Sequence, residues 1–146
     1  MDIYFKTFQE LNKNELYAIL QLRSEVFVVE QNCVYQDIDG KDETALHVIG
    51  TINKNIIAYT RCFRPGDYFE QASIGRVVVR EGHRGIGLAH KIMQRSVDAI
   101  TNRFNTKTIK VSAQTYLKEF YEKHNFFQYG EEYLEDGIPH IAMILE

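Results

Sequence analysis

The sequence predicts one mixed α/β domain, because stretches with strand periodicity and stretches with helix periodicity follow one another along the whole chain. A length of 146 residues suits a single domain. Hydrophobic residues make up 45% of the chain and charged residues 25%, a balance typical of globular proteins. A glycine-rich segment joins a strand to a helix near the middle. No repeat, low-complexity tract or linker divides the sequence, so we expect residues 1–146 to form one domain.

The first half of the chain predicts a strand, a helix, a loop and a hairpin. Asn12 and Glu15 form a capping-box pattern that marks the start of the helix. Asn53-Lys54-Asn55 is a short turn-forming segment between two β-prone runs. The expected elements are a strand over residues 2–8, a helix over 13–28, a polar loop over 30–44, and strands over 47–52 and 56–63.

The second half predicts strands and helices on both sides of the glycine-rich segment. Ser73 to Val79 is a β-branched run typical of a buried strand. Asp136-Gly137-Ile138-Pro139 supplies a turn between the last two strands. The expected elements are a strand over residues 73–79, a glycine-rich loop over 81–87, a helix over 87–102, a strand over 108–112, a short helix over 117–123, and strands over 126–133 and 141–145.

Composition excludes several classes of function. A formal net charge of −3 argues against a nucleic-acid binder, although it leaves room for a local basic site. The chain shows no apolar run of membrane-spanning length and no signal peptide, so a cytoplasmic protein without a membrane partner is expected. Cys33 and Cys62 lack metal-ligand spacing and are expected to be small, partly buried hydrophobes rather than nucleophiles. His83 and His90 have no third ligand, so no metal is expected.

The glycine-rich junction carries the strongest chemical signal. Val77-Val78-Val79 ends a strand, a loop with Gly82, Gly85 and Gly87 follows, and a helix begins at about Leu88. The free N–H groups at a helix N-terminus favour phosphate, and glycines let the backbone approach it closely. Arg84 adds a permanent cation with a fork suited to phosphate. The junction therefore predicts a phosphate site.

Two common phosphate motifs do not fit this junction. A dinucleotide fingerprint needs a third glycine where His90 stands and an acidic residue near Ser112, and neither is present. A Walker loop needs Gly-Lys-Ser/Thr, which is also missing. A plain tight turn into a core helix remains open as the structural alternative.

Arg84-x-x-Gly87-x-Ala89 matches the Gln/Arg-x-x-Gly-x-Gly/Ala signature and so resembles the GNAT superfamily of N-acetyltransferases. The resemblance implies a central, mostly antiparallel mixed sheet of about six to seven strands flanked by helices. It implies acetyl-coenzyme A as co-substrate, with its pyrophosphate on residues 84–89 and its pantetheine along residues 77–79. The implied coenzyme-binding residues are Val77, Val78, Val79, Arg84, Gly85, Ile86, Gly87, Leu88, Ala89 and Gln114.

A second segment, Phe120-Tyr121-Glu122-Lys123-His124-Asn125-Phe126, resembles the tyrosine-bearing segment of the same superfamily. The resemblance places Tyr121 near the coenzyme sulfur, where a phenol can protonate the leaving thiolate. The segment departs from the family pattern at Asn125, where a glycine is usual, and at Gln114, where an asparagine is frequent. An amphipathic helix that merely buries Phe120 and Tyr121 is the structural alternative.

Longer matches indicate the ElaA-type branch of the superfamily, whose acceptor the resemblance does not name. They are residues 22–31, residues 35–42 and residues 135–140. The candidate acceptor-binding residues in the first two are Arg23, Glu30 and Asp39. The acidic residues could attract a cationic amine or form a solvated loop, and Arg23 could contact the acceptor or form a structural ion pair. His140, after a turn, is a candidate base or a structural hydrogen-bonding group.

These features predict transfer of the acetyl group of acetyl-coenzyme A to the amine of a small-molecule or peptide acceptor. The absence of a nucleophile motif favours direct attack without a covalent enzyme intermediate. Two alternatives remain open, a non-catalytic acyl-coenzyme A sensor or partner subunit, and an enzyme for a larger acyl group. A homodimer is also open, because many members of this superfamily dimerise.

Overall fold

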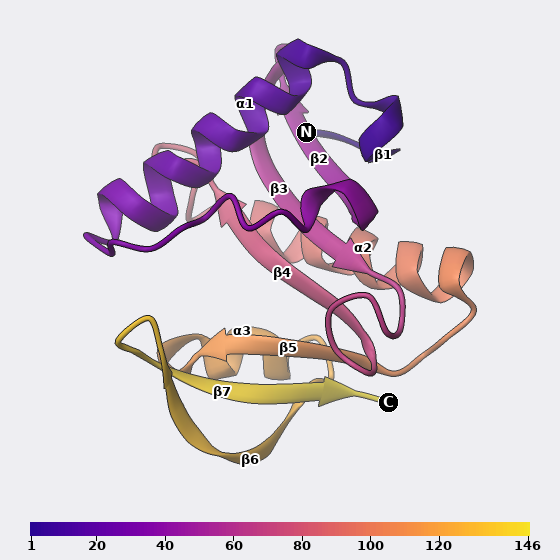
Figure 1. The fold of residues 1–146 in the computed structure, drawn as a ribbon, viewed down its shortest axis with the longest axis vertical. Coiled ribbons are helices and arrows are strands. Elements are labelled where there is room, and N and C mark those ends of the chain that lie inside the picture. Colours follow the sequence, from indigo (N-terminus) through magenta and orange to yellow (C-terminus); the bar gives the residue numbers. More distant parts are fainter.

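The computed structural model describes residues 1–146, which form one seven-stranded sheet in the order β1-β2-β3-β4-β5-β7-β6 (Figure 1). Neighbouring strands are antiparallel except β4 and β5, which are parallel. The expected mostly antiparallel mixed sheet is therefore confirmed. The strands are β1 Asp2–Thr7, β2 Leu46–Ile52, β3 Asn55–Phe63, β4 Ala72–Val79, β5 Ile109–Gln114, β6 Phe127–Glu135 and β7 Ile138–Leu145. The α-helices are α1 Lys13–Arg23, α2 Leu88–Phe104 and α3 Lys118–Glu122.

Helices cover both faces of the sheet (Figure 1). The apolar stripe of α2, with Ile92, Met93 and Ile100 fully buried, packs in the larger core cluster with β2 to β5 and β7. On the opposite face, Ile19 and Leu22 of α1 pack in the smaller cluster. Spacing of these side chains at three and four residues puts them on one face of each helix. No helix is both long and apolar enough to cross a membrane.

The first helix changes type part-way along. The predicted capping box is present, since Asn12 Oδ1 accepts from the Glu15 N–H at 2.8 Å and Glu15 Oε1 accepts from the Asn12 N–H at 2.9 Å. The α-helix ends at Arg23, and a π-helical segment continues over Ser24–Glu30. The predicted single helix over 13–28 was therefore wrong in type beyond Arg23. π-helical turns are rare and often occur at functional sites.

Two hairpins turn on two residues each. Asn53 and Lys54 both have positive φ, +50° and +66°, as a type I′ turn requires. Asp136 and Gly137 do the same, with φ of +52° and +78°. The predicted turn over residues 136–139 was too long, because a type I′ turn needs only two central residues and β7 already pairs from Ile138.

β4 and β5 pair only at their first residues, Ala72 with Ile109 and Ser73 with Lys110, and then diverge (Figure 1). A bulge in β4 accompanies the divergence. Arg61 pairs with Gly75 and Tyr59 with Val78, so Arg76 and Val77 together face one residue of β3. Arg76 has a φ of +50°. A bulge bends its strand, and the result is a fork in the middle of the sheet whose inner edges have no strand partner.

Candidate functional site

Two cavities meet at the fork. One, here called the loop cavity, has about 330 Å³ and lies beside the glycine-rich loop, with Val77, Val79, Arg84 and Ala89 in its wall. The other, the hairpin cavity, has about 120 Å³ and reaches the β6–β7 hairpin. Six residues line both cavities, which places them end to end across the fork. These shared residues are Phe27, Gln31, Val77, Gln114, Leu117 and Tyr121.

The loop cavity ends at the N-terminus of α2. Gly82, Gly85 and Gly87 have φ of +90°, +83° and +83°, conformations that L side chains rarely adopt. Helix α2 begins at Leu88 and runs for 17 residues. Its first backbone N–H groups have no acceptor within the helix, and its dipole is positive at this end. The loop can therefore hold an anion against backbone donors.

Arg84 crosses from this loop to the π-helical segment. Its Nε donates to the Val79 carbonyl at 2.8 Å, and its two terminal nitrogens donate to the Glu30 carboxylate at 2.7 and 3.0 Å. The hydrogen bond between the two side chains lowers the pKa of Glu30 and raises the pKa of Arg84. Two residues predicted for different roles, coenzyme and acceptor binding, thus form one ion pair beside the loop cavity.

Tyr121 stands where the two cavities meet. It lies in α3, its side chain is 5% exposed, and its ring packs edge-on against Phe120 and Phe126. The hydroxyl group makes no hydrogen bond within the protein, although the residue lines both cavities. Burial raises the pKa of Tyr121, so its phenol keeps its proton and can donate it.

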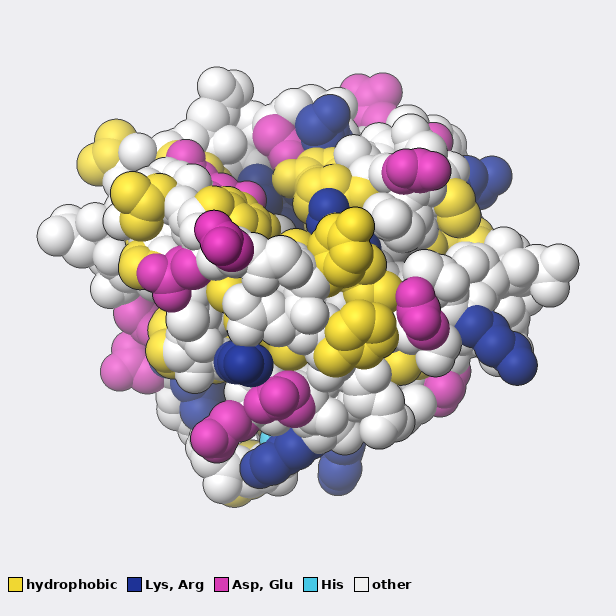
Figure 2. All heavy atoms as spheres, turned by 90° about the horizontal axis from the view of Figure 1, so that it is seen from below, with side chains coloured by type: hydrophobic (Ala, Val, Ile, Leu, Met, Phe, Trp, Pro, Cys, Tyr) yellow, Lys and Arg dark blue, Asp and Glu magenta, His cyan; other side chains and the backbone are white.

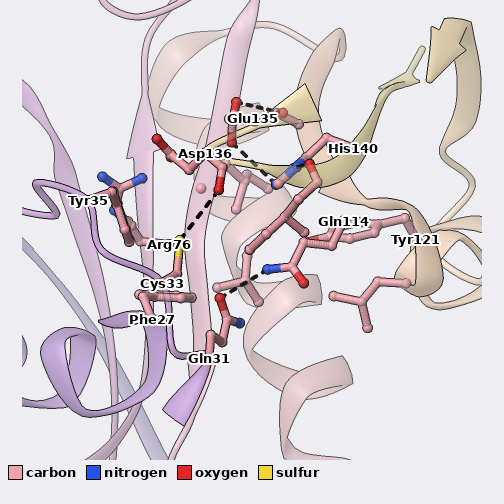
Figure 3. A pocket seen from close by; sticks show the side chains of 16 residues that line it. Phe27, Gln31, Cys33, Tyr35, Arg76, Gln114, Tyr121, Glu135, Asp136 and His140 are labelled. Atoms are coloured by element: carbon pink, nitrogen blue, oxygen red, sulfur yellow. Dashed lines mark hydrogen bonds and ion pairs between the residues drawn. The ribbon is translucent and has the colours of Figure 1, made fainter. Parts of the chain in front are cut away.

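His140 and Glu135 form the far wall of the hairpin cavity (Figure 3). His140 Nδ1 lies 2.7 Å from the Ile138 carbonyl, and since a carbonyl only accepts, Nδ1 carries a proton. His140 Nε2 then faces Glu135 Oε2 at 3.3 Å. The other Glu135 oxygen accepts from Ser112 Oγ at 3.1 Å, and Ser112 also hydrogen-bonds Tyr133. The wall can bind a cation or relay a proton.

The opposite wall rests on a largely buried cluster of three arginines and three aspartates. The side chain of Arg23 is 0% exposed and donates to Asp37 at 2.9 Å and to Asp42 at 2.7 Å. Arg76, which lines the cavity, donates to Asp37 at 2.7 Å. The cluster consists of Arg23, Arg61, Arg76, Asp37, Asp39 and Asp42. Its charges balance, and it fixes the polar loop after the π-helical segment against β3 and β4.

A family model for the acetyltransferase (GNAT) domain matches residues 9–146. This chain belongs to the GNAT acetyltransferase family. It is similar to protein ElaA of Escherichia coli strain K12, with 44% identity over 139 residues that cover 94% of this chain and 91% of ElaA.

Solved structures agree with the GNAT assignment. An acyl-CoA N-acyltransferase from Pseudomonas aeruginosa superposes with a TM-score of 0.94 at 39% identity, and covers 100% of both chains. The crystal structure of E. coli ElaA gives a TM-score of 0.92 at 39% identity, again over 100% of both chains. Family and neighbours support acyl transfer from a coenzyme A thioester as the general chemistry of this GNAT chain.

Most residues predicted for the coenzyme lie together in this GNAT domain. Gly85, Ile86, Gly87 and Leu88 form the end of the loop and the start of α2. The other six line the loop cavity, namely Val77, Val78, Val79, Arg84, Ala89 and Gln114. Gln114 also donates to Gln31 at 3.3 Å across the mouth of the fork.

The predicted acceptor residues do not line the hairpin cavity. Of the two roles considered for Arg23, acceptor contact and a structural ion pair, the structure shows the ion pair. Arg23 is fully buried and therefore out of reach of an acceptor. Asp39 is held by both terminal nitrogens of Arg61 at 2.8 Å, and Glu30 is held by Arg84. The ion-pair partner of a charged residue can lie far away in sequence. Local sequence patterns therefore do not identify it.

Sequence reasoning missed several residues that do line the hairpin cavity. Glu135 and Asp136 lay within a matched segment, yet no pattern marked them as cavity residues. The only local signal for Arg76 was a charged residue inside a β-branched run. Cys33 lines this cavity as well, whereas Cys62 is fully buried and its pKa is raised by burial to about 12.

The end of the molecule that carries β6 and β7 presents hydrophobic side chains among charged ones (Figure 2).

Proposed function

We propose that this protein transfers the acetyl group of acetyl-coenzyme A to a primary amine of a small molecule or peptide by direct attack. The observation that carries this proposal is the position of Tyr121, whose unpaired, protonated hydroxyl lies where the two cavities meet. A proton donor between a coenzyme cavity and an acceptor cavity suits the departure of a thiolate.

The coenzyme would occupy the loop cavity. Its pyrophosphate would bind the backbone of residues 84–89 at the N-terminus of α2, and its pantetheine would lie along Val77 to Val79. Support comes from the fork, because the edge of β4 beyond Ser73 has no β5 partner and its backbone groups can pair with an amide-bearing chain. A backbone N–H near Val77 would stabilise the oxyanion that forms on the thioester carbonyl.

The acceptor would enter from the hairpin cavity. Its ammonium loses a proton to His140 or to ordered water, and the neutral amine attacks the thioester carbonyl carbon. As the new C–N bond forms and the C–S bond breaks, the thiolate takes the Tyr121 proton. The surplus proton on the new amide nitrogen then passes through ordered water to the Tyr121 phenolate. Glu135 Oε2 lies 3.3 Å from His140 Nε2, close enough to accept a hydrogen bond from this nitrogen once it has taken the proton.

Calorimetric titration with acetyl-coenzyme A tests the coenzyme site. We expect micromolar binding that is lost in an Arg84→Ala, Gly87→Glu double variant, because the variant removes a cation and places a carboxylate in the loop. No binding to the native protein would refute the proposal.

An acceptor screen that follows thiol release tests the transfer. Tight coenzyme binding with no transfer to any amine would favour the sensor or partner subunit instead. Comparison of acetyl, propionyl and longer thioesters would separate acetyl transfer from transfer of a larger acyl group.

A further inference from the structure

The loop cavity and the hairpin cavity meet at a passage that we call the neck. It is lined by the six residues that the two cavities share, of which three are apolar and three carry a polar side-chain group. The apolar ones are Phe27, Val77 and Leu117, and the polar ones are Gln31, Gln114 and Tyr121. In the proposed reaction the thioester sulfur lies beside Tyr121 and the amine comes from the hairpin cavity. The acyl group would therefore lie in the neck.

A hydrogen bond between two glutamine side chains crosses the neck (Figure 3). Gln114 Nε2 donates to Gln31 Oε1 at 3.3 Å, although the two residues are 83 positions apart in sequence. Gln114 ends β5 and Gln31 follows the π-helical segment, so the two amides come from opposite sides of the fork. The two sides of the neck thus meet through polar groups, even though half of the lining is apolar.

Local structure directs both amides to this place. The Gln31 N–H donates to the Val26 carbonyl, five residues earlier, as in a π-helical turn. Such a turn holds one residue more than an α-helical turn and so changes the direction of the side chains that follow α1. Gln114 pairs with His140 and lies on the same face of β5 as Ser112, because side chains two residues apart share a face. The π-helical segment and the end of β5 together place Gln31 opposite Gln114.

Each of the two amides keeps a polar group that no other protein group satisfies. An amide has two N–H donors and one acceptor oxygen, and the bond between the two side chains uses only Gln114 Nε2 and Gln31 Oε1. Both residues are partly buried, and neither remaining group is enclosed by protein, so water in the cavities can bind them. An apolar chain that displaces such water offers no hydrogen bond in return, which weakens its binding.

The same chain would bind more tightly in a neck that was apolar throughout. Two methylene groups that leave water for an apolar site strengthen binding roughly tenfold, and this is the difference between a butyryl and an acetyl group. A polar group left without a partner weakens binding by roughly five- to 100-fold. The amides of Gln31 and Gln114 would therefore cancel or outweigh the gain from a longer chain.

We propose that Gln31 and Gln114 act as a polarity filter in the neck, which accepts an acetyl group and disfavours longer hydrocarbon acyl chains. This inference rests on the proposed function for the position of the thioester. The single methyl group of acetyl can lie against the apolar side chains of the neck. A butyryl group must also cover the amides or extend into the hairpin cavity, where the acceptor would bind. The two glutamines are thus specificity-determining residues for the acyl donor.

Calorimetric titration with acetyl-coenzyme A and butyryl-coenzyme A, without an acceptor, tests the filter in the native protein. The nucleotide and pantetheine are the same in both ligands, so their contacts cancel in the ratio of the two affinities. We expect butyryl-coenzyme A to bind no more tightly than acetyl-coenzyme A. A preference of the native protein for butyryl-coenzyme A would overturn the inference.

Gln31→Met and Gln114→Met, singly and together, separate polarity from size, because methionine is a flexible, unbranched side chain of similar length without the amide. The double variant should bind butyryl-coenzyme A roughly tenfold more tightly than acetyl-coenzyme A. Each single variant should move the ratio in the same direction. Gln94→Met, at an exposed glutamine of α2 outside both cavities, is the matched control and should keep the native ratio. A native ratio in the double variant would overturn the inference, since size alone would then limit the chain.

Thiol release in the presence of acceptor amines separates this inference from the proposed function. Transfer of acetyl and butyryl groups with equal kcat/KM, in the native protein and the double variant alike, would refute the inference and leave acyl transfer standing. Native binding without a preference for butyryl that gains this preference in the double variant, with no thiol release on any amine, would support the inference and count against transfer.

Discussion

The Arg84 guanidinium donates to both carboxylate oxygens of Glu30, at 2.7 and 3.0 Å, across 54 residues of sequence. Glu30 ends the π-helical segment and Arg84 belongs to the glycine-rich loop, so the pair joins two walls of the loop cavity. Arg84 therefore has an anionic partner before any coenzyme binds. A pyrophosphate that approaches this loop must compete with Glu30 for the guanidinium.

Glu30→Gln should tighten the binding of acetyl-coenzyme A roughly three- to tenfold, because it removes the competing carboxylate. Arg84→Ala should weaken binding about tenfold, and the double variant should behave like Arg84→Ala alone. Calorimetry measures all three, and melting temperatures should change little because the pair is exposed. Weaker binding in Glu30→Gln would mean that the intact pair, rather than free Arg84, serves the coenzyme.

Tyr121→Phe should lower kcat about 100-fold while leaving coenzyme affinity unchanged. The hydroxyl group has no partner within the protein, so its loss should not lower the melting temperature. Steady-state kinetics on an accepted amine, with calorimetry for the coenzyme, gives both quantities. An unchanged kcat would remove Tyr121 from the chemistry.

His140→Asn should lower kcat/KM roughly 100-fold, because it removes the ring nitrogen Nε2 that would take the acceptor proton. The asparagine amide nitrogen lies at the position of Nδ1 and can still donate to the Ile138 carbonyl, so the hairpin should keep its shape. Steady-state kinetics on an accepted amine measures kcat/KM for both proteins. An unchanged kcat/KM would remove His140 from the chemistry.

Arg23→Met should destabilise the fold by about 3–5 kcal/mol, because it leaves Asp37 and Asp42 buried without that partner. Urea unfolding measures the change. Lys91→Met, at an exposed cationic residue of α2, is the control and should cost less than about 0.5 kcal/mol. A small loss in Arg23→Met would show that the cluster does not depend on this arginine.

Acid should weaken the fold through the same cluster. Partial burial by itself would raise the pKa of Asp39, but hydrogen bonds from Arg61 lower it to about 2 from an ordinary value of 3.8. The unfolded chain thus binds more protons between these two values, so stability present above pH 3.8 is lost as the pH falls toward 2. Urea unfolding at several pH values should show a shallower loss in Asp39→Asn. Equal slopes would exclude Asp39 as a contributor.

Local chemistry in the sequence determined most elements of this fold and predicted a phosphate site at the glycine-rich loop. The capping box at Asn12, the turn at Asn53 and Lys54, and the glycines around Arg84 each act over a few residues, which is why sequence alone predicted them. Two matched segments also indicated the family that the comparisons confirmed. The bounds differed at Arg23, where the α-helix changes to a π-helical segment, and at Ile138, where pairing with β6 starts the last strand three residues before the predicted Ile141.

Only the tertiary structure decided where the charged side chains and the cavities lie. The fork depends on a bulge at Arg76 and on pairing between strands that are distant in sequence, and no local pattern specifies either. Arg23 and Glu30 had candidate roles in acceptor binding until the fold gave them partners. The hydrogen bond between Gln31 and Gln114 exists only once the fold brings the end of the π-helical segment to the end of β5. The function of a charged or hydrogen-bonding side chain depends on the residues that surround it. These contacts form only when the chain folds.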